Sequence, residues 1–359
     1  MGRPSLSFVG NGAGSGNGER MDAGSAKGNH TAMTTILDVA RAAGLSTATV
    51  SRALREPEKV TEKTRAKVFK AVEAVSYRPN MLARNLRTDK SFTLLVLVPG
   101  IANPFFANVT AGIEATAWKR GYSVLLGDTR DSAEREEHYA RLVETRLADG
   151  VIQLSPDYAP ADSRRRAPYP IVHACGCELT EAPSVRIDNV GAMREVVAHL
   201  IARGHRRIAA ISGPQANAHA IDRLKGYRQA LEAAGIAFDP ALVLHGSFRM
   251  QSGFEAAREI LAMTPRPTAI VSINDEMAIG AIQALAALGV SVPSDIAVTG
   301  FDDIDFAAHS TPALTTVRQP AAEMGAKACE LLIDWIEDKA RDEAVHILPH
   351  TLVVRESSG

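Results

Sequence analysis

The 359-residue chain has few cysteines and no long apolar run, and both absences exclude classes of protein. Three cysteines, Cys175, Cys177 and Cys329, indicate a reducing compartment and no disulfide framework. No stretch is apolar enough to cross a membrane, and residues 1–33, rich in Gly, Ser, Asn and Ala, hold no apolar run of signal-peptide length. We therefore expect a cytoplasmic protein with no membrane partner. Residues 1–33 are predicted to be a disordered extension, and we hypothesise that Met33 is the true start.

The sequence also lacks the spacings that indicate a metal site or catalysis. Cys175 and Cys177 lie near His173, but C-x-C with one histidine lacks a fourth zinc ligand, so buried or loop thiols are the simpler interpretation. The glycines at 10–18 do not fit the dinucleotide-binding spacing, and no strand precedes them. No Ser/His/Asp or paired-carboxylate set is evident. The sequence thus predicts no metal, no cofactor and no enzymatic activity.

Residues 36–54 have the pattern of two helices joined by a three-residue turn. The first helix presents Ile36, Val39 and Ala40 on one face, and Gly44 supplies the unhindered backbone that a steep turn needs. Ser46 is placed to cap the second helix. The outward face of that second helix is small and polar with one cation, which suits contacts with bases and phosphates in a major groove. Its members are Thr47, Ala48, Thr49, Ser51 and Arg52.

Two further features favour DNA binding over an ordinary helical hairpin. A third helix is predicted at 61–77, burying Val68, Phe69, Val72 and Val75, so that three helices close a small core. Between residues 34 and 90 there are twelve Lys/Arg and six Asp/Glu, a net charge of +6. The whole chain carries −1, so the remainder carries −7. A basic head on an acidic body is typical of a nucleic-acid-binding protein.

From about residue 35 to its C-terminus the chain resembles the lactose repressor family of bacterial regulators. The resemblance is carried by D-V-A at 38–40, S-T-A-T-V-S-R-A-L at 46–54, V-T-E-K-T-R at 60–65, Y-R-P-N at 77–80, A-R-N-L-R at 83–87, I-D-N at 187–189, R-G-H-R-R-I at 203–208, N-D-E-M-A-I-G-A at 274–281, G-F-D-D at 300–303 and P-A-L-T-T-V-R-Q-P at 312–320. It implies a helix-turn-helix domain at 34–79 that binds double-stranded operator DNA. It also implies a homodimer, possibly of higher order, because one such head reads only a few base pairs.

Residues 80–90 are predicted to be a linker. The stretch is too short for a stable isolated helix, so we expect it to be disordered without DNA. In the family this segment is the hinge helix, and the leucine matching Leu86 inserts into the minor groove. In this chain Leu86 lies between Arg84 and Arg87, and Arg84 and Leu86 are candidate DNA contacts. A plain flexible linker is the alternative, and it predicts that Leu86→Ser is harmless to operator binding.

From residue 91 to 359 short apolar runs alternate with amphipathic helices, which predicts parallel sheets covered on both faces. The runs lie at 93–98, 122–127, 150–154, 170–173, 207–212, 269–273 and 296–300. So long a segment favours two doubly wound subdomains. The resemblance likewise implies a periplasmic-binding-protein-like pair of lobes for effector binding and dimerisation. A last strand from 348 is expected to return to the second lobe.

Ligands of open parallel sheets lie beyond the carboxyl ends of the strands, so the residues there are candidates for an effector site. Phe105, Phe106 and Phe248 offer aromatic faces, while Arg223, Asn274 and Asp302 offer hydrogen bonds. This chemistry suits a base or a sugar ring. The resemblance assigns effector binding to the positions of Phe105, Asn217, His219, Arg223, Phe248, Asn274 and Asp302.

Several alternatives remain at this point. Purine-binding members of the family carry an arginine and a threonine where this chain has Asn217 and His219, which argues against a purine effector. His219 is alternatively a helix-cap residue, and each phenylalanine a core residue. A sugar-binding protein without a regulatory role would share the same body. If the chain is a regulator, effector binding would change its operator affinity through the dimer, as inducer or as co-repressor.

Overall fold

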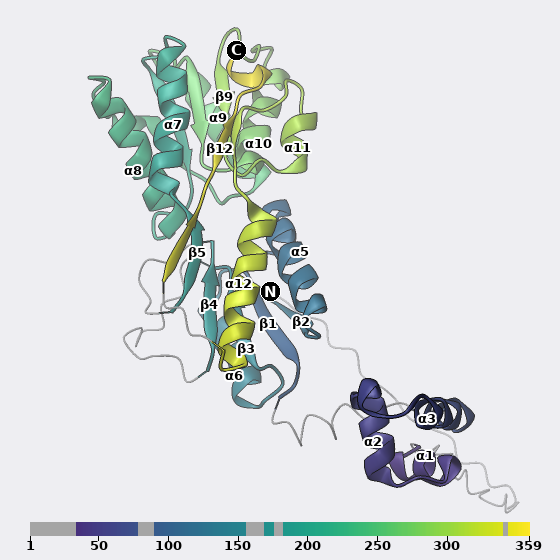
Figure 1. Ribbon diagram of the computed structural model, residues 1–359. Coiled ribbons are helices and arrows are strands. Elements are labelled where there is room, and N and C mark those ends of the chain that lie inside the picture. Colours follow the sequence, from purple (N-terminus) through teal and green to yellow (C-terminus); the bar gives the residue numbers. More distant parts are fainter. Residues whose placement is uncertain (1–33, 78–89, 156–168, 176–181, 340–343) are drawn as a thin grey trace, which may run out of the picture. The chain divides into compact units, whose positions relative to one another are not determined.

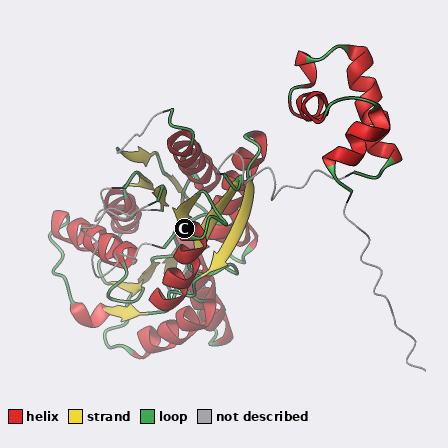
Figure 2. Cartoon of the chain, turned by 90° about the horizontal axis from the view of Figure 1, so that it is seen from below, coloured by secondary structure: helices red, strands yellow, loops and turns green. Residues whose placement is uncertain are grey.

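The computed structural model describes residues 34–77, 90–155, 169–175, 182–339 and 344–359. The chain forms two compact units that divide between residues 81 and 82, within the segment predicted to be a linker. The smaller unit is called the head and the larger one the body below. Both are drawn in Figure 1, and Figure 2 shows the strands of the body lying among its helices.

The head consists of helices α1 (Ile36–Ala43), α2 (Thr47–Arg55) and α3 (Glu62–Ala74), with a short 3₁₀ helix, η1 (Pro57–Lys59), between the last two. The carboxylate of Asp38 accepts a hydrogen bond from the Thr35 backbone N–H at 2.9 Å and fixes the start of α1. Gly44 ends α1 in the left-handed region, with φ at 56°. Ser46 caps α2, as predicted, because its hydroxyl accepts from the N–H of Thr49 at 3.1 Å.

The three helices of the head enclose a core of small and β-branched residues. Its fully buried members are Val39, Ala40, Ala43, Val50, Ala53, Val68 and Ala71. The prediction that Phe69 is buried is wrong: 46% of its surface is exposed. α3 also ends three residues earlier than predicted, and Ala71 turns toward the core beside Val68. Val68 and Ala71, three residues apart, form the face of α3 that meets the core, and Phe69 lies to the side of that face.

The body alternates strands and helices along the chain. The strands are β1 (Thr93–Val98), β2 (Ser123–Asp128), β3 (Gly150–Gln153), β4 (Ile171–Ala174), β5 (Ser184–Ile187), β6 (Ile208–Ser212), β7 (Val243–His245), β8 (Ala269–Ser272), β9 (Ala297–Thr299), β10 (Thr316–Arg318), β11 (Val345–Leu348) and β12 (Thr351–Val353). The helices are α5 (Pro104–Lys119), α6 (Ala133–Glu144), α7 (Asn189–Ala202), α8 (Ala218–Ala233), α9 (Met250–Ala262), α10 (Asp275–Ala287), α11 (Asp305–His309) and α12 (Ala321–Ile336), with short 3₁₀ helices η2 (Pro240–Leu242) and η3 (Glu356–Ser358).

Two parallel sheets define two lobes, which confirms the predicted fold class. The first lobe has a six-stranded sheet in the order β11-β5-β4-β3-β1-β2, and the second a four-stranded sheet in the order β7-β6-β8-β9. The first-lobe sheet is not buried throughout: β2 is an edge strand that exposes Leu125 and Leu126. The predicted apolar runs did not include β5, β7, β10 and β11.

The described chain passes between the lobes three times: after β5, between β10 and α12, and between β11 and β12. The end of the chain returns to the second lobe as predicted. There Ser357 donates to the carbonyl of Val298 and accepts from the N–H of Thr315. The predicted last strand is shorter than expected, however, and the preceding β11 joins the first lobe (Figure 1).

Helices pack closely in pairs wherever glycine removes the side chain between them. On α5 and α12, a Cβ at Gly112 would lie 1.9 Å from the carbonyl oxygen of Ala322. On α9 and α10, a Cβ at Gly253 would lie 2.0 Å from the carbonyl oxygen of Met277. Any larger residue would push these helices apart, and α9 and α10 both begin at the site described next.

Candidate functional site

The predicted DNA-binding side chains of α2 lie on its accessible face. Thr47, Ala48 and Arg52 are exposed, and Thr49 and Ser51 are half-buried. Arg52 forms no ion pair with another described residue of the head, so its guanidinium is available to a base edge or a phosphate. Arg84 and Leu86 lie outside the described residues. The DNA-contacting role of all seven residues stays a prediction.

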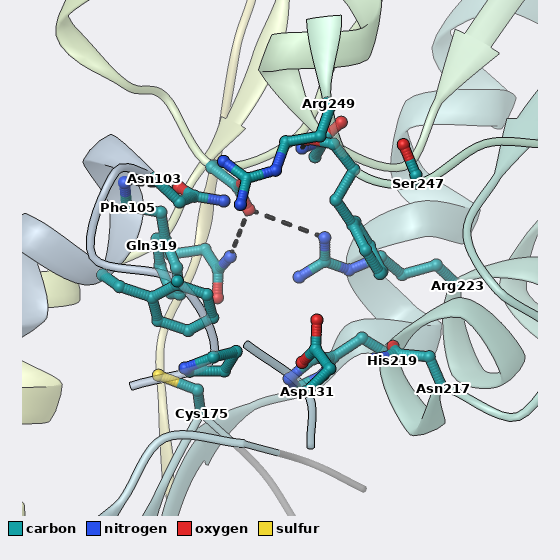
Figure 3. A pocket seen from close by; sticks show the side chains of 16 residues that line it. Asn103, Phe105, Asp131, Cys175, Asn217, His219, Arg223, Ser247, Arg249 and Gln319 are labelled. Carbon is teal, nitrogen blue, oxygen red and sulfur yellow. Dashed lines mark hydrogen bonds and ion pairs between the residues drawn. The ribbon is translucent and has the colours of Figure 1, made fainter. Parts of the chain in front are cut away.

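A cavity of about 710 Å³, counted with its open mouth, lies between the two lobes of the body (Figure 3). All eight predicted effector-binding residues line it: Phe105, Phe106, Asn217, His219, Arg223, Phe248, Asn274 and Asp302. The other residues around it are Pro99, Gly100, Asn103, Asp131, Cys175, Ser247, Arg249 and Gln319. The structure therefore brings the predicted set together, while its binding role stays a prediction.

Four helices begin at this pocket, and three of them are capped by asparagine. The side chains of Asn103, Asn217 and Asn274 accept hydrogen bonds from the first turns of α5, α8 and α10 at 2.9 to 3.1 Å. This arrangement follows from the parallel sheets, because each helix starts just beyond the carboxyl end of a strand. The proposed cap role of His219 is wrong: Asn217 caps α8, and the His219 ring faces the cavity.

Arg223 and Asp302 form a buried pair on the second-lobe side of the pocket. Arg223 Nη1 lies 3.5 Å from Asp302 Oδ1, and the guanidinium carbon lies 3.7 Å from the centre of the Phe301 ring. Arg223 Nε donates to Asn189 Oδ1 at 2.9 Å, and Gln319 Nε2 donates to Asp302 Oδ1 at 2.7 Å. Both side chains are therefore fixed before any ligand binds.

Asp302 stands on a strained turn that its neighbours hold in place. Asp302 and Asp303 both have positive φ, at 122° and 55°, a conformation that is unfavourable for a side-chain-bearing residue. The Asp303 carboxylate pairs with Arg318 and with Arg355, each at 2.6 Å. Asp275, buried beneath the turn, accepts from the N–H of Ile304 at 2.9 Å. This network holds the Asp302 carboxyl at the pocket wall.

Burial shifts the titration of several groups that line the pocket. It raises the pKa of Asp302 to about 8, with Asp275 adding to the rise and Arg223 opposing it. Burial, with the Arg223 charge adding to it, lowers the pKa of His219 to about 3, so this ring is neutral at physiological pH. Burial also raises the pKa of the Cys175 thiol. The Asp302 carboxyl and the neutral His219 imidazole can both form hydrogen bonds with the hydroxyls of a ring-shaped ligand.

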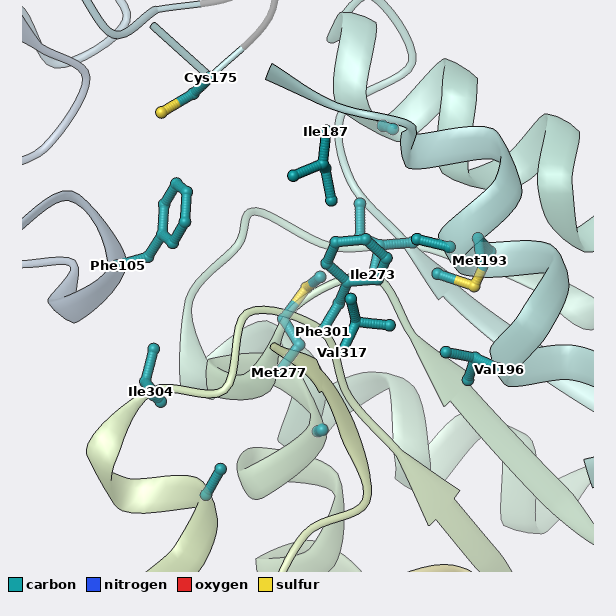
Figure 4. Packing of buried hydrophobic residues seen from close by; sticks show 14 of the residues in the cluster. Phe105, Cys175, Ile187, Met193, Val196, Ile273, Met277, Phe301, Ile304 and Val317 are labelled. Atoms are coloured by element: carbon teal, nitrogen blue, oxygen red, sulfur yellow. The ribbon is translucent and has the colours of Figure 1, made fainter. Parts of the chain in front are cut away.

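The aromatic side chains come from both lobes. Phe105 and Phe106 stand edge to face with centroids 5.3 Å apart at the start of α5. Phe248 of the second lobe has a positive φ of 62°. Its ring packs against Gly213, where a Cβ would lie only 2.6 Å from the ring. Behind the pocket, Phe301 packs with Ile273 and Val317 in the core (Figure 4). Ring faces from two lobes can thus hold a flat ligand.

Sequence reasoning missed several pocket residues. Gln319 lies just after the three-residue strand β10, which has no readable periodicity. Arg249 directly follows Phe248 and was a detectable neighbour, but a single arginine in a turn gives no signal by itself. Asp131 and Cys175 adopt positive φ in loops whose course is set by tertiary contacts.

Within the described residues no group of three or more His, Cys, Asp or Glu is arranged to hold a metal ion. Cys175 and Cys329 are buried free thiols, and Cys177 lies outside the described part of the chain. Among the described helices, none has both the length and the apolar character needed to cross a membrane.

A basic three-helix head and a two-lobed body with a small-molecule pocket define a ligand-responsive DNA-binding regulator. Residues 35–80 match the model of bacterial regulatory proteins of the lacI family, and residues 197–358 match that of a periplasmic binding protein-like domain. The chain belongs to the lacI family of bacterial regulatory proteins. It is a sequence-specific transcriptional regulator, which excludes the alternative of a sugar-binding protein without a regulatory role.

Individual relatives agree with this assignment. The chain is 38% identical over 328 residues to the HTH-type transcriptional repressor CytR of Escherichia coli strain K12, covering 90% of this chain and 96% of the repressor. It is 34% identical to catabolite control protein A of Priestia megaterium, covering 90% and 99%. Within the family, the segments at 46–54 and 103–106 predict a similarity to the cytidine repressor, and the match to CytR confirms it.

Solved structures give the same result. The lac repressor dimer bound to operator and the anti-inducer ONPF superimposes with a TM-score of 0.82 at 29% identity, covering 90% of this chain and 99% of that one. The transcriptional regulator CelR in complex with cellobiose gives a TM-score of 0.69 at 34% identity, with the same coverage.

Proposed function

We propose that this regulator is a homodimeric repressor whose affinity for operator DNA is set by a nucleoside or sugar bound in the pocket between its lobes. The proposal rests on one observation: aromatic side chains and the fixed Arg223–Asp302 pair line the same cavity. Stacking on Phe105, Phe106 and Phe248 would hold a base or sugar ring. Asp302 and Arg223 would read its hydroxyls and ring oxygens.

On the DNA side we propose that the α2 face enters the major groove of each half-site. Thr47, Ala48, Thr49, Ser51 and Arg52 would contact bases and phosphates, and Arg84 with Leu86 would act at the centre of the operator. Dimerisation is supported by the small size of the head, which needs two copies for useful specificity. We also propose that the protein has no enzymatic activity and acts in the cytoplasm, where its operator is.

Thermal unfolding of the full chain tests the effector class. A ligand that binds only the folded protein stabilises it, by about 2.7 kcal/mol at a hundred times its Kd. Nucleosides, pentoses and hexoses are compared on the wild type and on Asp302→Asn, which removes the carboxyl without changing its size. At least one probe should raise the Tm of the wild type and raise that of Asp302→Asn much less. Failure of every probe to stabilise the wild type would contradict the proposal.

A further inference from the structure

Of the two arginines that line the pocket, Arg223 is held by fixed partners and Arg249 is not. Arg223 is paired with Asp302 and donates to Asn189 and to the carbonyl of Ile273. His219 carries no charge at neutral pH, as its lowered pKa shows. The Arg249 guanidinium, by contrast, forms neither an ion pair nor a hydrogen bond with another residue of the part of the chain that the structure describes.

Two other carboxylates belong to this region, and neither is paired with Arg249. Glu276, on the first turn of α10, has a pKa that burial raises and that the Arg249 charge lowers to a smaller extent. Asp131 lines the pocket from the first lobe, and in Figure 3 it lies on the opposite side of the cavity from Arg249. The charge of Arg249 is therefore only partly offset.

Arg249 is placed to act on a ligand that occupies the cleft. It is exposed, stands at the start of α9 and reaches toward the first lobe, where its Nη2 lies 3.1 Å from the position of a Cβ on Gly100. Asn103 flanks the same end of the pocket (Figure 3). Its Oδ1 accepts from the N–H of Phe105 at 2.9 Å, so its amide nitrogen remains a donor. Donors from both lobes thus lie at one end of the cavity.

We propose that the effector carries a phosphomonoester on its nucleoside or sugar ring, and that Arg249, with Asn103, binds this group at the mouth of the pocket. The inference rests on the proposed function, because it names the chemical class of the ligand of the same site. A guanidinium presents its N–H groups in a fork that matches two phosphate oxygens. An exposed arginine also needs little desolvation to reach the anion, while the ring lies deeper, against the phenylalanines.

Isothermal titration calorimetry of the full-length protein with matched probe pairs tests the proposal. The pairs are cytidine and its 5′-monophosphate, adenosine and its 5′-monophosphate, ribose and ribose 5-phosphate, and glucose and glucose 6-phosphate. At least one phosphorylated probe should bind about tenfold or more tightly than its neutral partner, since hydrogen bonds to charged groups are the strong ones. The preference should shrink at high salt.

Two variants test whether Arg249 causes the preference for phosphorylated over neutral probes. Arg249→Gln should abolish it, measured as the ratio of the affinities for the two members of each probe pair. The matched control is Arg258→Gln, another exposed arginine on α9 outside the pocket lining, and it should keep the preference. Equal thermal unfolding of both variants shows that neither has lost the fold.

The outcomes separate this inference from the proposed function. If a neutral nucleoside or sugar binds and phosphorylation gives no gain, or if Arg249→Gln keeps the gain, the inference is wrong and the proposed function stands. If no member of any pair binds, both are overturned.

Discussion

At the scale of single residues, the pocket depends on the Asp302 carboxyl, which is buried away from water on a backbone turn of unfavourable conformation. Asp302 is buried, lies on a strained turn and is fixed by Gln319 and Arg223. Hydroxyl groups of a ligand that donate to this carboxyl would replace the hydrogen bonds to water that burial removes. The buried groups around Asp302 are therefore preorganised for a polar ring, and the strain is maintained by the Asp303 network beneath it.

The raised pKa of Asp302 predicts a pH-dependent effector affinity. Below its pKa of about 8 the carboxyl is protonated, and its ionised form accepts hydrogen bonds from an effector more strongly. The affinity should therefore rise with pH, by up to about tenfold per unit below the pKa, and level off above it. Calorimetry at several pH values on the wild type and Asp302→Asn measures this. A wild-type affinity that falls with pH, or a variant with the same slope, would contradict the prediction.

Arg52 should carry sequence discrimination, whereas Lys67 on α3 should not. Arg52→Ala should cost about 1–3 kcal/mol on the operator and little on bulk DNA, because a base contact is lost. Lys67→Ala should weaken binding to all sequences alike and reduce the salt slope by about 1. Fluorescence anisotropy on operator variants at several salt concentrations measures both. Equal loss on all sequences from Arg52→Ala would mean that it contacts only phosphate.

At the scale of elements, the site is built by helices that begin where strands end. α5, α8, α9 and α10 all start at the pocket, and the helix pair α9 and α10 is held close by Gly253 and Gly280. The spacing of these two helices sets where Arg249 and Asn274 stand. The packing of these first helical turns thereby determines the geometry of the pocket next to them.

Gly253→Ala should destabilise the body, since its Cβ would meet the Met277 backbone at 2.0 Å. Overpacking of this kind costs about 1–3 kcal/mol. The control is Arg258→Ala on the exposed face of α9, expected to stay within about 0.5 kcal/mol of wild type. Thermal unfolding monitored by circular dichroism compares the two. A Gly253→Ala variant as stable as the control would show that α9 can move away from α10 freely.

The elements also show how far sequence reasoning reaches. The turn at Gly44, the cap at Ser46 and the strands that form continuous apolar runs were readable, because local chemistry dictates each of them. The effector-binding candidates follow strands or belong to a family pattern, so they too were predicted. Phe69 was misplaced because an apolar residue next to the buried face of a helix need not itself be buried. Gln319 was missed because tertiary packing brings it to the pocket, and Arg249 because a single arginine beside Phe248 carries no signal of its own.

At the scale of the whole molecule, the chain joins two units of opposite charge and different purpose. The head recognises DNA and the body encloses a ligand, and the body's lobes are connected by three crossings of the chain. Closure of the lobes around an effector would rotate one lobe against the other across those crossings. In a dimer this movement would change the spacing of the two heads and hence the operator affinity, typically by 1–3 kcal/mol of coupling.

The most direct test is the affinity of the dimeric full-length protein for an operator selected from genomic fragments, measured with and without the effector that stabilises it. We expect one sequence class to bind far more tightly than bulk competitor DNA, and effector to change that affinity by about 5- to 150-fold in either direction. The same affinity with and without bound effector, or no preference for any fragment over competitor, would contradict the account.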